Sequence, residues 1–194
     1  MNSTVNSQRL FIASCFALLT TAFAFGIRAG IMNDLVADMS LDDSQLGWIN
    51  FMGIFGFPIA TLVGGPMYNT LGPRKIGNIA FVCHLLGITF SILSSSFYTL
   101  FFSTFFISFG NGMVEAAYNP MIAAMYTEKR AVMLNRFHVW FPGGIAIGSV
   151  LALLVANMGG GWQIKLAIMY VPALIYFFLL IQTPGGSESW NMCN

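Results

Sequence analysis

One carboxylate lies in one of the most apolar stretches of the chain. It is Glu115, within the segment GNGMVEAAYNP. A charged side chain at the centre of a membrane helix costs about 2.5–3.5 kcal/mol on insertion scales, so something must offset it. One explanation is a buried carboxylate that holds two helices together. The other is a carboxylate in a wet cavity that loads and releases a proton or binds a solute hydroxyl.

A second charged side chain, Arg28, also lies deep in an apolar run. Because arginine does not lose its proton in proteins, it is a permanent cation. Heights above the inner side of the membrane follow from a rise of about 1.5 Å per residue. Arg28 lies about 27 Å above the inner end of its span at Leu10, and Glu115 lies about 16 Å above the inner end of its span near Tyr126. The two side chains therefore differ in height by about 10 Å. This offset allows a direct ion pair only in a strained geometry, and a water or a solute between the two side chains fits as well. We expect Arg28 and Glu115 to flank the path of a solute.

Other polar side chains lie in or near the apolar runs. Asn135 could bind a solute or cap a helix, and His138 could bind a solute, relay a proton or lie at the membrane interface. His84 is typical of a buried hydrogen bond between helices. These groups are too few and too dispersed for a nucleophile–base pair or a metal site. We therefore expect neither an enzyme nor a cofactor.

The composition indicates that the folded chain is surrounded by lipid and not by water. Of the 194 residues, 57% are hydrophobic and 8% are charged, with a mean hydropathy of +0.75, whereas about 25% of the residues of a soluble domain are charged. Eight Lys and Arg balance seven Asp and Glu, which leaves no basic surface for nucleic acid. The chain is therefore expected to be an integral membrane protein.

Turn signals divide the chain into six apolar runs long enough to cross a bilayer. The expected spans are about 10–31, 45–68, 76–93, 97–125, 136 to the NMGGG segment, and 162–182. The fold class is then an all-α membrane protein with a tail at 1–9, a six-helix transmembrane domain at 10–182 and a second tail at 183–194. The N-terminal tail and the even-numbered loops hold six Lys or Arg, and the odd loops hold only Lys165. By the positive-inside rule both termini are cytoplasmic, in a plasma (inner) membrane.

The segment GGPMYNTLGPRK between the second and third spans reads as a tight turn with a positive anchor. Its spacing also resembles the loop signature G-x-x-x-D-R-x-G-R-K of the major facilitator superfamily. In this chain Asn and Thr replace the Asp-Arg pair, which argues against the charge lock of the family but preserves the turn. The resemblance implies a cytoplasmic gate loop, and the residues concerned are Gly65, Asn69, Gly72, Arg74 and Lys75.

A second resemblance joins GNGMVEAAYNP to LNRFHVWFPGG at Leu134–Gly144. The pair is similar to the fucose:proton symporter branch of that superfamily, which has G-x-G-x-x-E-x-x-x-N-P in its fourth helix and then L-N with a polar residue three positions later. The matching positions are Glu115, Asn119, Pro120, Asn135 and His138. The acid that the branch carries in its first helix aligns without gaps with Ala29, next to Arg28, and with a gap of a few residues with Asp34.

The resemblance implies the N-terminal half of a twelve-helix fold, built as a 3+3 inverted repeat. It also implies a proton-coupled secondary transporter of a small polar solute such as a sugar. Because the similarity covers half of that fold, the chain is expected to be truncated and to lack a C-terminal half, or to work as a dimer of halves. Two alternatives stay open: a carrier of small anions, which Arg28 favours, and a six-helix membrane protein without transport.

Overall fold

The computed structural model describes residues 6–181, and all regular secondary structure in that part is helical. The elements are α1 (Ser7–Met39), α2 (Asp43–Ile92), α3 (Phe97–Met125), the 3₁₀ helix η1 (Thr127–Lys129), α4 (Arg130–His138), α5 (Trp140–Asn157), α6 (Trp162–Ala167) and α7 (Tyr170–Ile181). Among the described residues, five stretches are long and apolar enough to cross a membrane. The protein is an integral membrane protein, as its composition predicts. The expected tail at 183–194 lies outside the described residues.

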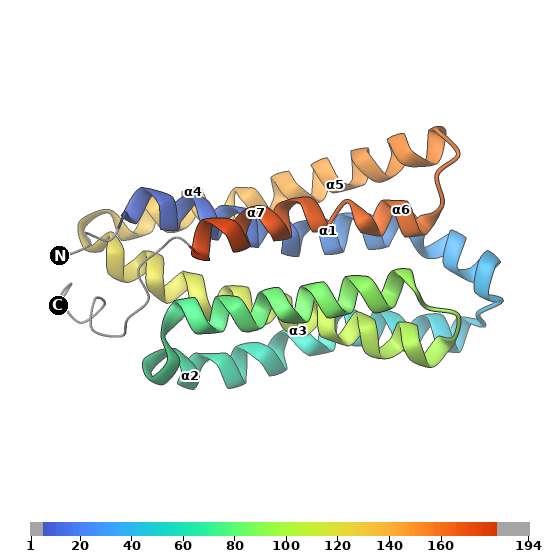
Figure 1. The fold of residues 1–194 in the computed structure, drawn as a ribbon, viewed down its shortest axis with the longest axis horizontal. Helices are drawn as coiled ribbons and strands as arrows, with labels where there is room; N and C mark the ends of the chain where they lie inside the picture. Colours follow the sequence, from blue (N-terminus) through green and yellow to red (C-terminus); the bar gives the residue numbers. More distant parts are fainter. Residues whose placement is uncertain (1–5, 182–194) are drawn as a thin grey trace.

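The element α2 consists of two helical limbs that meet at Gly72. A straight helix of 50 residues would be about 75 Å long, more than twice the thickness of the hydrocarbon core. The backbone at Gly72 has φ 75° and ψ 164°, a conformation that essentially only glycine adopts. Figure 1 shows the chain reversing its direction there. The first limb (43–71) and the second limb (73–92) correspond to two expected spans, so the chain crosses the membrane six times.

The packing shows the expected 3+3 arrangement. The first three-helix unit is α1 and the two limbs of α2, and the second is α3, then α4 with α5, then α6 with α7. In Figure 1 and in the contacts between elements, α1 packs mainly on α5 and α7, whereas α3 packs mainly on α2. The leading helix of each unit therefore packs on the other two helices of the opposite unit, as an inverted repeat requires.

The helix α3 lies close to both limbs of α2 because glycines face it. A Cβ added to Gly56 would lie 2.8 Å from the carbonyl oxygen of Phe105, and one added to Gly87 would lie 2.8 Å from the backbone nitrogen of Ile107. Residues 56 and 87, on different limbs, thus contact the same turn of α3. Further along α3, Gly64 of the first limb faces Ala116 and Gly77 of the second limb faces Tyr118, so the two limbs run antiparallel against the helix that carries Glu115.

The helix α1 differs from its expected bounds at both ends. It begins at Ser7, so Arg9 belongs to the helix and donates a hydrogen bond from Nε to the Leu179 carbonyl of α7 at 3.1 Å. This contact places the start of α1 and the end of α7 at the same end of the bundle. At its other end α1 continues to Met39 and does not stop near Ile31. The expected end of the first span was wrong because a long-range contact keeps the polar turns helical.

That contact joins α1 to α6. The carboxylate of Asp34 pairs with Lys165 Nζ at 2.5 Å, and Asp38 accepts a hydrogen bond from Trp162 Nε1 at 2.8 Å. Lys165 is only 4% exposed, so its ammonium has little access to water. The short helix α6, which is separated from α7 by a break at 168–169, therefore holds the last two turns of α1.

Candidate functional site

Glu115 lies half-buried on α3 and accepts a hydrogen bond from Nδ2 of Asn119, one helical turn further along the same face. His138, exposed at the end of α4, interacts electrostatically with Glu115. The other amide atom of Asn119, Oδ1, is buried and has no hydrogen-bond partner among residues 6–181. The structure thus brings together three of the residues that the sequence selects, and leaves one acceptor free beside the carboxylate.

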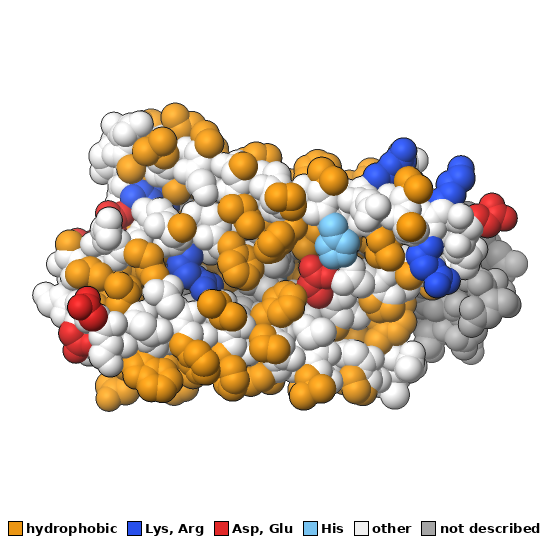
Figure 2. Space-filling view, turned by 180° about the vertical axis from the view of Figure 1, so that it is seen from behind, with side chains coloured by type: hydrophobic (Ala, Val, Ile, Leu, Met, Phe, Trp, Pro, Cys, Tyr) orange, Lys and Arg blue, Asp and Glu red, His pale blue; other side chains and the backbone are white. Residues whose placement is uncertain are grey.

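Figure 2 shows this region on the face opposite to the one seen in Figure 1. A histidine side chain lies directly beside an acidic one near the middle of that face. Of the two histidines of the chain, His84 is fully buried and His138 is exposed. Apolar side chains border the pair, and basic side chains gather toward one end of the face. The Glu115 group is therefore reachable from this face while it stays within an apolar surface.

Asn135 does not join this group by any hydrogen bond among the described residues. It is exposed in the interior of α4, and its carbonyl accepts a hydrogen bond from the Val139 N–H at 3.0 Å. The interpretation of Asn135 as the cap of the fifth span was wrong, because that span begins earlier, at Arg130, and bends between α4 and α5. Its role as a site residue stays a prediction.

Arg28 reaches from α1 to the first limb of α2. A Cβ added to Gly53 would lie 1.6 Å from Nη1 of Arg28, so the guanidinium fills the place of a side chain at residue 53. Its Cζ lies 5.9 Å from the centre of the Phe25 ring. Within residues 6–181 the guanidinium has no carboxylate partner and no hydrogen-bond acceptor.

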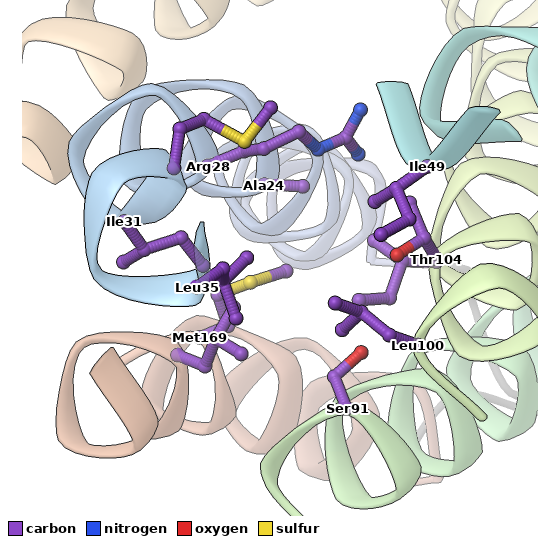
Figure 3. A pocket seen from close by; sticks show the side chains of 12 residues that line it. Ala24, Arg28, Ile31, Leu35, Ile49, Ser91, Leu100, Thr104 and Met169 are labelled. Carbon is purple, nitrogen blue, oxygen red and sulfur yellow. The ribbon is translucent and has the colours of Figure 1, made fainter. Parts of the chain in front are cut away.

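A small cavity lies next to Arg28 between α1, both limbs of α2, α3 and α6 (Figure 3). Its volume is about 20 Å³, enough for one water molecule. Figure 3 shows the Arg28 side chain extending from α1 toward Ile49. Apolar side chains make most of the wall, Ser91 and Thr104 add hydroxyl groups, and no acidic side chain lines it.

Arg28 and Glu115 do not pair. No hydrogen bond or ion pair joins them in the described part of the chain. Thr104 lines the Arg28 cavity, and Glu115 lies 11 residues further along α3, about 16 Å at the helical rise. The direct ion pair that the sequence left open is therefore absent, and the two charges occupy separate places along the membrane normal.

Asp34, the alternative acid of the first helix, forms an ion pair with Lys165. Ala29, the residue aligned without gaps, is exposed beside Arg28. Sequence reasoning missed this ion pair. The signal for it was the position of Lys165 as the one basic residue in the odd loops, on the same side as the Asp-rich first loop. An unpaired acid equivalent to Glu115 is thus absent from the described part of α1.

His84 confirms its expected structural role. Its Nε2 lies 2.9 Å from Oδ1 of Asn111, and its Nδ1 lies 3.3 Å from the Tyr176 hydroxyl. All three side chains are fully buried. They join the second limb of α2, α3 and α7, and Asn111 lies one turn before Glu115 on α3. The group therefore fixes the helix that presents Glu115.

The expected gate loop is mostly helical. Gly65 and Asn69 lie on the first limb of α2, and Arg74 with Lys75 begins the second limb. Gly72 makes the turn itself, whereas a Cβ added to Gly65 would contact nothing within 4 Å. The predicted turn is confirmed at Gly72, and the predicted gating role is untested.

A sequence model of the Major Facilitator Superfamily matches residues 10–191. The chain belongs to this superfamily. It is 26% identical over 147 residues to the sphingosine-1-phosphate transporter SPNS2 of Danio rerio, in an alignment that covers 72% of this chain and 28% of that protein. It is 23% identical over 164 residues to monosaccharide-sensing protein 1 of Arabidopsis thaliana, which covers 84% of this chain and 22% of that protein.

The fold resembles that of the proton:xylose symporter XylE in its complex with 6-bromo-6-deoxy-D-glucose. The TM-score is 0.84 at 16% identity, with 96% of this chain and 48% of that chain covered. The chain thus spans less than half the length of these three proteins and has the fold of the N-terminal half of a superfamily transporter. Its family is one of transporters and not of enzymes.

Proposed function

We propose that this chain forms the N-terminal half of a secondary active transporter that moves a small polar solute, such as a sugar, together with protons. The observation that carries the proposal is the Glu115 group, a half-buried carboxylate within a membrane span, bonded to Asn119 and next to His138. No lysine or arginine pairs with this carboxylate among residues 6–181. A membrane carboxylate without a cation can carry a proton at low cost, because its protonated form is neutral.

Each polar group has a distinct role in this proposal. Glu115 loads the proton, and the amide N–H of Asn119 holds the carboxylate in one orientation. The free Oδ1 of Asn119 and the ring of His138 provide an acceptor and a second polar contact for solute hydroxyl groups. Asn135 lies one turn before His138 on α4 and extends the same polar edge. The similarity of these positions to the fucose:proton symporter branch supports the assignment.

The membrane arrangement is part of the same proposal. Alternating access rocks one half against another around a site near the midplane, so the partner is a second six-helix half or a second copy of this chain. The turn at Gly72, with Asn69 before it and Arg74 and Lys75 after it, lies at the inner gate. The excess of basic residues at this end of the bundle supports its location in the cytoplasm, and the membrane that we propose is a plasma (inner) membrane.

Solute-dependent proton uptake into liposomes tests the proposal. The 194-residue chain is compared with the same chain joined to a six-helix C-terminal half, using L-fucose, D-xylose, D-glucose and D-gluconate as probes. We expect the joined protein to alkalinise the medium when a probe is added, and Glu115→Gln to abolish this signal. Glu128→Gln is the matched control because Glu128 is exposed on η1. Wild-type alkalinisation by Glu115→Gln would refute the role of Glu115.

A further inference from the structure

Arg28 is a cation in a membrane span, and its neighbours among residues 6–181 supply no negative charge. We propose that Arg28 binds the carboxylate group of the solute, so that the cargo is a small polar carboxylate such as a sugar acid, carried with one proton on Glu115. This inference rests on the proposed function and names the solute class for it. A carrier of this kind differs from a neutral-sugar carrier because the carboxylate of its solute forms an ion pair with Arg28 inside the protein.

The surroundings of Arg28 are built to hold the guanidinium and to leave its donors unused. Gly53 gives it space, and the Phe25 ring lies 5.9 Å from Cζ. Arginine has five N–H donors, and none of those of Arg28 has an acceptor among residues 6–181. An uncompensated charge at this depth is costly. A carboxylate offsets this cost best because its two oxygens match the planar guanidinium.

The adjoining cavity favours a monovalent group over a phosphate. It has a volume of about 20 Å³, and its walls are largely apolar. The second negative charge of a phosphate would find no further cation there, since no other basic residue lines the cavity. The Ser91 hydroxyl donates to Oγ of Ser103 at 2.8 Å, so Thr104 supplies the wall hydroxyl that can donate to a carboxylate. The cavity itself has the size of one water molecule, and the selection of a single negative charge therefore comes from Arg28, the one cation on its wall among the described residues.

The charges of the chain then explain coupling. In the empty state the Arg28 cation and the Glu115 anion sum to zero. In the loaded state the solute carboxylate neutralises Arg28, and a proton neutralises Glu115. Solute without proton, or proton without solute, leaves one net charge, which is costly in a low-dielectric interior. The carboxylate stays ionised throughout, and the bond that forms and breaks is the O–H bond of Glu115.

The remaining charged groups near these elements do not alter this balance. Asp34 and Lys165, on α1 and α6, neutralise each other. His138, from α4, faces Glu115 and is exposed to solvent. The transport step is therefore one carboxylate with one proton, without net charge movement.

Binding to the purified chain tests the Arg28 site directly. The probes are D-gluconate, D-glucuronate and D-lactate, against neutral D-glucose and L-fucose. We expect a carboxylate to bind, and Arg28→Gln to lower its affinity roughly 10- to 100-fold, as loss of a charge-assisted hydrogen bond does. The control Arg136→Gln, at an exposed position on α4, should not change it. Binding of the neutral sugars alone, or an unchanged affinity in Arg28→Gln, overturns the proposal.

Folding and transport measurements complete the test. Thermal unfolding of ligand-free Arg28→Gln should occur at or above the wild-type temperature, because the substitution removes an unpaired and costly charge; a large loss of stability would indicate a structural Arg28. In liposomes, carboxylate uptake by the joined protein should not respond to a potassium diffusion potential. If Arg28→Gln still moves protons with a neutral sugar, the proposed function stands and this inference fails. If Arg28-dependent carboxylate binding occurs without any proton movement, the proposed function and its coupling fail instead.

Discussion

Nη1 of Arg28 lies where a side chain on residue 53 would begin, since a Cβ added to Gly53 would be 1.6 Å from that nitrogen. The first limb of α2 therefore accepts the guanidinium against its backbone. A long basic side chain in a membrane helix usually extends toward the nearer interface. Gly53 provides an alternative position for the guanidinium, between α1 and α2.

Gly53→Ala should displace the Arg28 guanidinium without removing its charge. A contact of 1.6 Å is impossible for a real Cβ atom, so the flexible end of Arg28 has to move. We expect the affinity for a carboxylate solute to fall on the order of tenfold, the effect of one weakened charge-assisted hydrogen bond. Isothermal titration of the purified variant measures this change. Gly47→Ala is the matched control on the same limb, because an added Cβ there contacts nothing within 4 Å.

Glu115→Gln should separate solute exchange from net uptake. Glutamine mimics the protonated carboxylate, so the loaded carrier stays neutral and can still reorient. The empty carrier then keeps the Arg28 charge uncompensated, and its return across the membrane becomes slow. We expect exchange of labelled for unlabelled solute to persist while net proton-driven uptake is lost. Loss of both activities in a folded variant would argue that Glu115 binds the solute itself.

Hydropathy and turn chemistry predicted most of the fold because both are local. The six spans, the turn at Gly72 and the grouping of Glu115, Asn119 and His138 follow from residues close together in the sequence or from a known pattern. The length of α1 did not follow, since its polar last turns are held by Lys165, 131 residues away from Asp34. Neither did the place of Arg28, which depends on a glycine of another helix. Such contacts depend on how the helices pack, which periodicity does not encode.

The ion pair between Asp34 and Lys165 should contribute to stability at the end of the bundle where α1 ends. Asp34→Asn leaves the ammonium of Lys165 buried without its counter-charge, and we expect a loss on the order of 2 kcal/mol. Lys165→Met in the same chain should recover much of this loss, because it removes the uncompensated charge. Chemical unfolding of the single and double variants in detergent gives the coupling free energy. Strictly additive effects would show that the pair contributes nothing as a pair.

Gly72→Ala should strain the turn between the limbs of α2. The φ of 75° with ψ of 164° is unfavourable for a residue with a Cβ, and holding it there costs about 1–3 kcal/mol. Thermal unfolding should therefore occur at a lower temperature in Gly72→Ala than in Gly65→Ala, the neighbouring control whose added Cβ meets open space. Equal unfolding temperatures in the two variants would contradict the assigned backbone strain.

The buried group of His84, Asn111 and Tyr176 should stabilise the helix that presents Glu115. Tyr176→Phe removes the hydroxyl that lies 3.3 Å from Nδ1 of His84, and we expect a loss of about 1 kcal/mol. His84→Leu should cost more, because it also leaves the Asn111 side chain buried without a partner. Thermal unfolding compares both variants with Tyr98→Phe, which removes an exposed hydroxyl. If Tyr176→Phe unfolds at the same temperature as Tyr98→Phe, the contact between His84 and Tyr176 does not hold α7 to α2.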